Sequence, residues 1–86
     1  MESDQVLEDA LATQPDNLET CYKLAVVKVV SGEYEAALQH AMTILQRDRS
    51  FRDDLGRTTM IRIFTLLGKG SDLATTYRRR MFNFMH

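Results

Sequence analysis

Only one cysteine, Cys21, occurs in the 86 residues, so the chain cannot close an internal disulfide, and no cysteine–histidine spacing suggests a metal site. No apolar run approaches the roughly 18 residues that a membrane-spanning helix needs. The first twenty residues contain no base, which excludes the basic start of a secretory signal peptide at this end of the sequence. These absences favour a cytoplasmic protein with no metal, no cofactor and no membrane segment.

The charges that are present lie unevenly along the chain, although the net charge is only −1. Residues 1–20 hold six acidic side chains, whereas residues 47–86 hold nine basic and four acidic ones. This distribution is typical either of solvated helix faces that complement helix dipoles or of a polarised surface that orients a partner. With 44% apolar and 27% charged residues, the composition is that of one small soluble domain.

Apolar periodicity and capping residues predict five helices. They cover residues 3–14, 18–31, 34–47, 51 or 52 to 67, and 71 or 72 to nearly 86. The valines of the second segment would suit a strand, but the capping residues on both sides favour a helix buried on two faces.

Each predicted boundary has a residue that ends or begins a helix. Pro15 ends the first helix, and Asp16-Asn17 supplies an N-cap for the second. Gly68 follows the fourth helix, where a residue in the left-handed conformation is common, and Ser71 or Asp72 caps the fifth.

Residues 18–51 match the length and pattern of one 34-residue tetratricopeptide repeat, which is a helix–turn–helix unit. Counted from Leu18, the seventh and eighth positions hold Leu24 and Ala25, a large and a small apolar residue. The segment Gly-Glu-Tyr-Glu-Ala-Ala-Leu at 32–38 resembles the turn of the motif. Counted backwards, residues 3–14 become the second helix of an earlier repeat.

A second, degenerate repeat follows. Aligning Gly68 with Gly32 puts Met60 and Ile61 at the seventh and eighth positions, with about two extra residues around 49–54. We therefore expect an all-α solenoid of five antiparallel helices, in which one intact repeat is flanked by a partial and a degenerate one. Residues 1–86 would form one domain, cut from the C-terminal part of a longer chain.

Over nearly its whole length, the sequence resembles the helical C-terminal domain of bacterial thioredoxin-like co-chaperones, the co-chaperedoxins. The residues that carry the resemblance are Arg47-Asp48, Asp53-Asp54, Arg57, Phe64, Leu67-Gly68, Asp72-Leu73 and Tyr77-Arg78-Arg79. The resemblance implies a bacterial cytoplasmic protein that holds unfolding clients and delivers them to a chaperonin, with the C-terminal end in docking. It also implies a thioredoxin-fold domain before this one. Because no Cys-x-x-Cys occurs here, no redox role follows for this segment.

No arrangement of residues predicts an enzyme. His40 and His86 have no cysteine or serine at a spacing that would place a triad. Asp53 and Asp54 are adjacent, so on a helix they diverge, and we expect them to form the acidic first turn of the fourth helix. The triple arginine at 78–80 is a weak phosphate-binding pattern, so we expect no nucleic acid. Cys21 is expected to be a small buried apolar residue.

Two surfaces are candidates for protein binding. In such arrays the first helix of each pair lines the concave face, which here gives two sets of positions. The first set is Glu19, Tyr22, Val26, Val29 and Val30, and the second is near Leu55, Thr58, Arg62, Thr65 and Leu66. An apolar groove of Tyr22, Val26 and Val29 with one cation, Arg62, suits an apolar helix or an unfolded segment. The alternative is that the valines pack against a preceding helix or domain.

The second candidate is the end of the last helix. Leu73, Tyr77, Met81 and Phe84 are expected to face the core, which leaves Phe82 and Met85 as an exposed apolar anchor for a partner. Arg78 and Arg79 would steer that partner electrostatically. The alternatives are a wider buried face, or a module that only dimerises or supports the parent protein.

Overall fold

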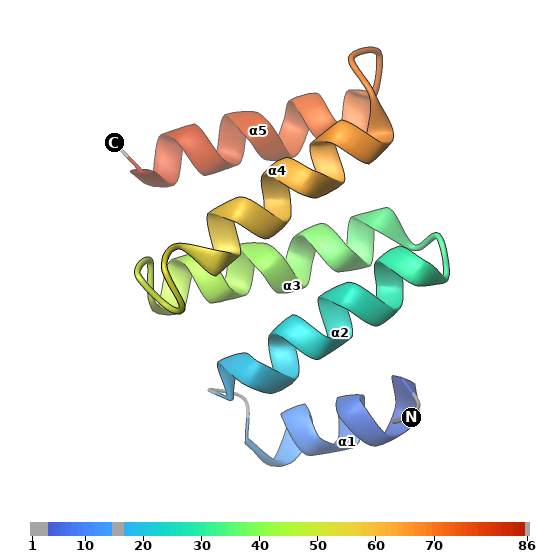
Figure 1. The fold of residues 1–86 in the computed structure, drawn as a ribbon, viewed down its shortest axis with the longest axis vertical. Helices are drawn as coiled ribbons and strands as arrows, with labels where there is room; N and C mark the ends of the chain where they lie inside the picture. Colours follow the sequence, from blue (N-terminus) through green and yellow to red (C-terminus); the bar gives the residue numbers. More distant parts are fainter. Residues whose placement is uncertain (1–3, 15–16, 86) are drawn as a thin grey trace.

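The structure is a computed structural model that describes residues 4–14 and 17–85. These residues form five helices and no strand: α1 (Asp4–Thr13), α2 (Leu18–Val30), α3 (Tyr34–Arg47), α4 (Leu55–Leu67) and α5 (Asp72–Met85). Each helix runs antiparallel to the one before it, and the five stack in chain order along the long axis (Figure 1). The predicted all-α class is confirmed.

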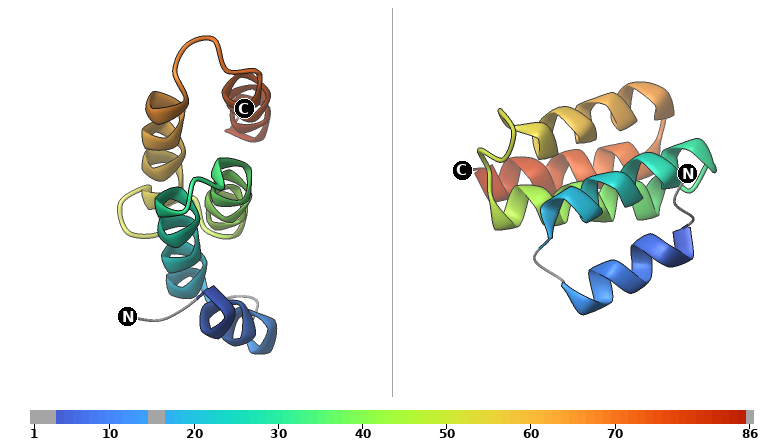
Figure 2. Two further views of the ribbon diagram at one scale, coloured as in Figure 1. Left: turned by 90° about the vertical axis from the view of Figure 1, so that its right-hand side faces the viewer. Right: turned by 60° about the horizontal axis from the view of Figure 1, so that its bottom comes forward.

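The stack has two layers. Seen from the side, α2 and α4 lie in one layer, and α1, α3 and α5 lie in the other (Figure 2). The molecule measures 34 × 27 × 18 Å. This alternation places the first helix of each pair on one face, as the repeat pattern predicts.

The caps that the structure describes agree with the sequence. Asn17 Oδ1 accepts a hydrogen bond from the Thr20 amide at 3.1 Å, and Ser71 Oγ accepts one from the Ala74 amide at 3.1 Å. Gly68 has a positive φ of 86°, as expected, but its ψ of 172° is extended rather than left-handed helical. The predicted roles of Pro15 and Asp16 concern residues outside those that the structure describes.

The predicted start of the fourth helix is wrong. The helix begins at Leu55, not at Phe51 or Arg52, because three successive residues, 52–54, have φ between 48° and 64°. Asp48 shapes the loop before them: its Oδ1 accepts hydrogen bonds from the amide and the hydroxyl of Ser50, at 3.1 and 3.0 Å.

The expected acidic first turn of the fourth helix is therefore also wrong. Asp53 lies in the loop, and Asp54 is the N-cap residue but makes no side-chain cap hydrogen bond. Aspartate tolerates the left-handed conformation better than most residues, which lets the chain reverse here without glycine.

Helix α3 lies at the centre of the core. It packs against α2 on one side and α4 on the other, and it also contacts α5. Six of its residues are buried: Ala37, Leu38, Ala41, Met42, Ile44 and Leu45. Burying each large apolar side chain contributes about 1.5–3 kcal/mol, so α3 holds the stack together.

The contact between α3 and α4 is close because α4 has a glycine there. A Cβ atom at Gly56 would lie 2.9 Å from the Leu45 amide nitrogen and 3.3 Å from the Ala41 carbonyl oxygen. Both neighbours are backbone atoms, which cannot move aside without shifting a helix. Gly56 therefore sets the distance between the two helices.

We predict that Gly56→Ala destabilises the domain by about 1–3 kcal/mol, although alanine usually favours a helix over glycine. Thermal unfolding followed by circular dichroism measures the effect. Gly70→Ala is the matched control, because a Cβ atom at Gly70 would meet nothing within 4 Å. A Gly56→Ala protein as stable as the wild type would contradict the close packing.

Candidate functional site

The described residues line two apolar grooves that are open to the surface. The first, which we call the α2–α4 groove, has a volume of about 190 Å³. Its walls are Tyr22, Val26, Val29, Val30, Thr59, Arg62, Ile63 and Leu66. The structure thus brings together all four residues that the sequence singles out for a groove: Tyr22, Val26, Val29 and Arg62.

The valines of this groove lie off the buried face of α2. That buried face carries Cys21, Leu24 and Ala25, whereas Val26 is 42% exposed and Val30 is 82% exposed. Tyr22 and Val29 are partly buried. The described part of the chain therefore leaves an apolar wall with one cation in contact with solvent.

The α4 side of this groove differs from the expected positions. Leu66 and Arg62 line it, but Thr59 and Ile63 take the places expected for Thr58 and Thr65. Two other expected positions, Glu19 and Leu55, do not line the groove, and Glu19 forms an ion pair with Arg52.

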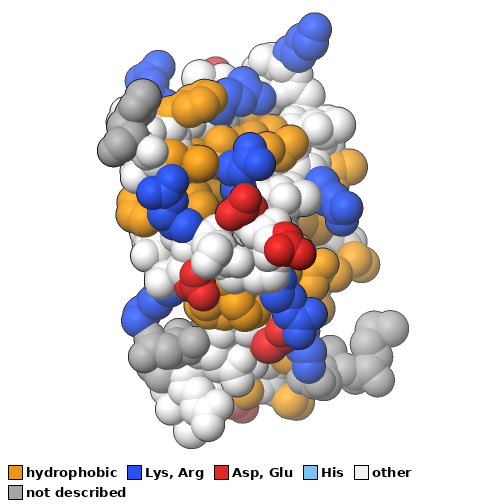
Figure 3. Space-filling model, turned by 60° about the vertical axis from the view of Figure 1, so that its left-hand side comes forward, with side chains coloured by type: hydrophobic (Ala, Val, Ile, Leu, Met, Phe, Trp, Pro, Cys, Tyr) orange, Lys and Arg blue, Asp and Glu red, His pale blue; other side chains and the backbone are white. Residues whose placement is uncertain are grey.

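The second groove, which we call the α4–α5 groove, is larger, at about 540 Å³. Its walls are Arg57, Ile61, Phe64, Thr65, Gly68, Lys69, Arg78, Met81, Phe82 and Met85. It includes the predicted docking residues Arg78, Phe82 and Met85, whereas Arg79 is exposed and lies outside its walls. In Figure 3, apolar side chains gather over the upper part of the molecule with lysines and arginines among them.

The inward face of α5 differs from the prediction by one position near its end. Ala74, Tyr77 and Met81 are buried, and Met85 continues this stripe by packing against the core. Phe84, expected in the core, is 37% exposed instead. Met85 is therefore only partly available to a partner, while Phe82 is 56% exposed, as predicted.

The α4–α5 groove exists because α4 and α5 pack less closely than α2 and α3. At equivalent repeat positions, α2 and α3 carry Ala25 and Ala37, both fully buried, whereas α4 and α5 carry Ile61 and Leu73. The second pair thus carries larger side chains where the first pair has alanine, and Ile61 is left 42% exposed. The sequence feature that indicates this groove is Ile61, which stands at the eighth repeat position, where the motif has a small residue.

One cation of this groove is held by an aromatic ring. The Arg78 guanidinium lies over the Phe64 ring, 5.1 Å from its centroid. Such a contact contributes about 0.5–1 kcal/mol at an exposed site. It links α5 to α4 and fixes one positive charge at the groove.

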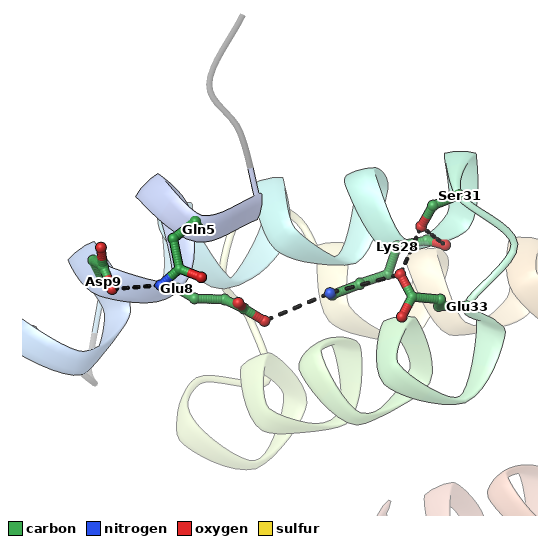
Figure 4. A network of polar contacts seen from close by, with 6 residues as sticks. All are labelled: Gln5, Glu8, Asp9, Lys28, Ser31 and Glu33. Carbon is green, nitrogen blue, oxygen red and sulfur yellow. Dashed lines mark hydrogen bonds and ion pairs between the residues drawn. The ribbon is translucent and has the colours of Figure 1, made fainter.

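A polar cluster joins α1 to the rest of the stack. The buried Lys28 Nζ lies 3.5 Å from a Glu8 oxygen of α1 and 3.7 Å from a Glu33 oxygen in the following turn (Figure 4). Glu33 in turn accepts a hydrogen bond from the Ser31 hydroxyl at 2.9 Å. The two carboxylates compensate the buried ammonium, so we assign the cluster a structural role.

His40 belongs to the same region. Burial lowers its pKa from the usual value, the positive charge of Lys28 lowers it further, and Glu8 partly opposes both effects. The folded protein therefore binds a proton at His40 less readily than the unfolded chain does. Neutral imidazole is the form that the fold favours.

We predict that the free energy of unfolding falls as the pH is lowered from 7.5 through about 6.5, the unfolded-state pKa of histidine. The unfolded state takes up the proton first, so acid shifts the equilibrium toward it. Urea unfolding at pH 7.5 and 6.0 measures the change, and His40→Gln should reduce it. Equal stability of the wild type at both values, or higher stability at pH 6.0, would contradict the prediction.

Catalytic chemistry finds no support in the described residues. Cys21 is buried, as expected, and burial raises the pKa of its thiol, although Arg47 partly opposes this. A protonated, inaccessible thiol is a poor nucleophile.

Within residues 4–14 and 17–85, no three His, Cys, Asp or Glu side chains cluster as metal ligands would. No helix in that part of the chain is long and apolar enough to cross a membrane.

Stacked antiparallel helix pairs with outward-facing grooves define a helical-repeat protein. Residues 2–86 match the tetratricopeptide repeat family, and the chain belongs to that family. Such repeats generally mediate protein–protein interactions, and their domains are typically not enzymes. Comparison with curated proteins and with solved structures gives no significant match.

Proposed function

We propose that this domain is the protein-binding module of a cytoplasmic, thioredoxin-like co-chaperone of bacteria. In this proposal the α2–α4 groove binds apolar segments of partly unfolded clients, and the end of α5 docks a chaperonin. A thioredoxin-fold domain would precede the module in the parent chain. The observation that carries the proposal is the exposed apolar wall of Val26, Val30 and Leu66, which the described part of the core does not use.

The shape of this groove suits an apolar segment of varied sequence. Valine side chains are stiff, so the wall loses little conformational entropy when a segment covers it. Arg62 supplies a single positive charge, which can pair with a carboxylate or a backbone carbonyl of the segment. Burying one large side chain contributes about 1.5–3 kcal/mol, and the loss of translational freedom offsets much of it. We therefore expect weak binding with little sequence preference.

At the end of α5, Phe82 supplies the exposed anchor and Arg78 and Arg79 supply positive charge. Phe84 adds exposed apolar surface that the sequence did not assign to this role. Charged side chains beside an apolar anchor raise the association rate more than the affinity. This combination fits transient docking of a client-loaded module.

The alternative is a structural module that only dimerises. The same exposed valines and leucine would then be covered by a second copy. Sedimentation at low micromolar concentration distinguishes the two, because a client-binding module with a free groove stays monomeric.

We predict that Val26→Glu weakens binding to a permanently unfolded protein, such as reduced and carboxymethylated lactalbumin, by about tenfold or more. The melting temperature should change little, because Val26 is already 42% exposed. Fluorescence anisotropy of the labelled protein measures binding. The matched control is Val6→Glu, the same substitution at a 54% exposed position on α1, outside both grooves.

Three results would contradict the role of this groove in client binding. The first is equal binding by Val26→Glu and Val6→Glu. The second is a large loss of thermal stability in Val26→Glu, which would show that Val26 is a packing residue. The third is a stable dimer of the wild type that Val26→Glu dissociates, which would favour the structural alternative.

A further inference from the structure

The α4–α5 groove combines an apolar floor with charges of one sign. Ile61, Phe64, Met81 and Phe82 form much of the floor, and three cations, Arg57, Lys69 and Arg78, stand among the lining residues. The lining includes no acidic side chain. We propose that this groove is the seat of an acidic amphipathic helix of a partner protein. The inference rests on the docking role proposed for the end of α5, because Arg78 and Phe82 belong to both, and it names the chemistry of the partner.

The dimensions of the groove correspond to about three turns of helix. On α4 it extends from Arg57 to Gly68, which at 1.5 Å per residue is about 16 Å. Two antiparallel helices that stand apart present a trough into which the side-chain ridge of a third helix fits. The partner helix would therefore insert apolar residues spaced at i, i+3 or i+4, and i+7.

The cations determine the charge of the partner. Because Arg78 is held over the Phe64 ring, its guanidinium is already fixed at the groove before a partner binds. Aspartate or glutamate beside the apolar ridge of the partner could pair with Arg78 or Arg57. A basic helix would meet three like charges and would be rejected.

A second copy of this chain fits the groove less well. Its acidic helix, α1, would have to supply the apolar ridge, but Leu7 of α1 is buried against its own stack. Val6 is the large apolar side chain that α1 leaves exposed. One valine cannot fill a groove of about 540 Å³. The partner is therefore a different protein.

The test is a selection from a display library of random 16-residue peptides on the wild-type domain. Peptides that also bind Phe82→Glu are removed, because this variant places a charge at the exposed apolar wall of the groove. We expect the enriched peptides to be acidic and to carry apolar residues at helical spacing. Peptides that are basic or uncharged, or no enrichment over Phe82→Glu, would overturn the proposal.

The enriched peptide is then measured by fluorescence anisotropy on single variants. Arg57→Glu and Arg78→Glu should each weaken its binding about tenfold, and added salt should weaken binding to the wild type. Arg49→Glu is the matched control for charge reversal, because Arg49 is exposed and lines neither groove, and it should bind within twofold of the wild type. Binding that survives both Arg57→Glu and Arg78→Glu would contradict the proposal.

Failure of this inference and failure of the proposed function give different results. The peptides removed in the selection step still bind Phe82→Glu, and loss of their binding in Val26→Glu would support the α2–α4 groove and not the α4–α5 groove. If no peptide is enriched over Phe82→Glu and none of the removed peptides is affected by Val26→Glu, both surfaces are excluded. The melting temperature of each variant is measured alongside, and a variant that unfolds is replaced by Phe82→Ala or Arg78→Gln.

Discussion

The rest of the structure depends on the close approach of α4 to α3 at Gly56. Backbone atoms of Ala41 and Leu45 lie so near this position that hydrogen is the only side chain that fits. This contact fixes α4 against the central helix. Since α3 also packs against α2 and contacts α5, a change in its distance from α4 would disturb most of the core.

The two complete helix pairs show how one motif gives two different surfaces. Small residues, Ala25 and Ala37, let α2 and α3 close on one another, and their interface is fully buried at these positions. In the next pair Ile61 and Leu73 stand at these positions and α5 packs less closely against α4, while Gly56 keeps α4 against α3. A groove between α4 and α5 is the geometric result, and the nearby arginines and lysine give it a positive charge.

Much of the fold could be predicted from the sequence because its signals are local. Helix periodicity is a signal of this kind, because it acts within a few residues. The same holds for the Asn17 and Ser71 caps and for the small residue Ala25 at the eighth repeat position. Four of the eight residues that line the α2–α4 groove, Tyr22, Val26, Val29 and Arg62, were singled out from repeat positions alone.

What could not be predicted depends on non-local geometry. The left-handed run at residues 52–54 follows a loop in which Asp48 binds Ser50, and it delays α4 by three residues or more relative to the prediction. The sequence also could not decide whether Phe84 or Met85 faces inward. The two residues are neighbours on α5, and which of them is buried depends on how α5 crosses α4.

Native-state hydrogen exchange of the individual amides tests the central claim that α4 is held by α3 while α5 is packed more loosely. If α3 holds α4 in this way, amides in the middle of α3 and α4 exchange only through global unfolding. Amides in the middle of α5 should exchange through a partial opening of lower free energy. Protection in α5 equal to or higher than that in α4 would show that α5 is packed as firmly as α4.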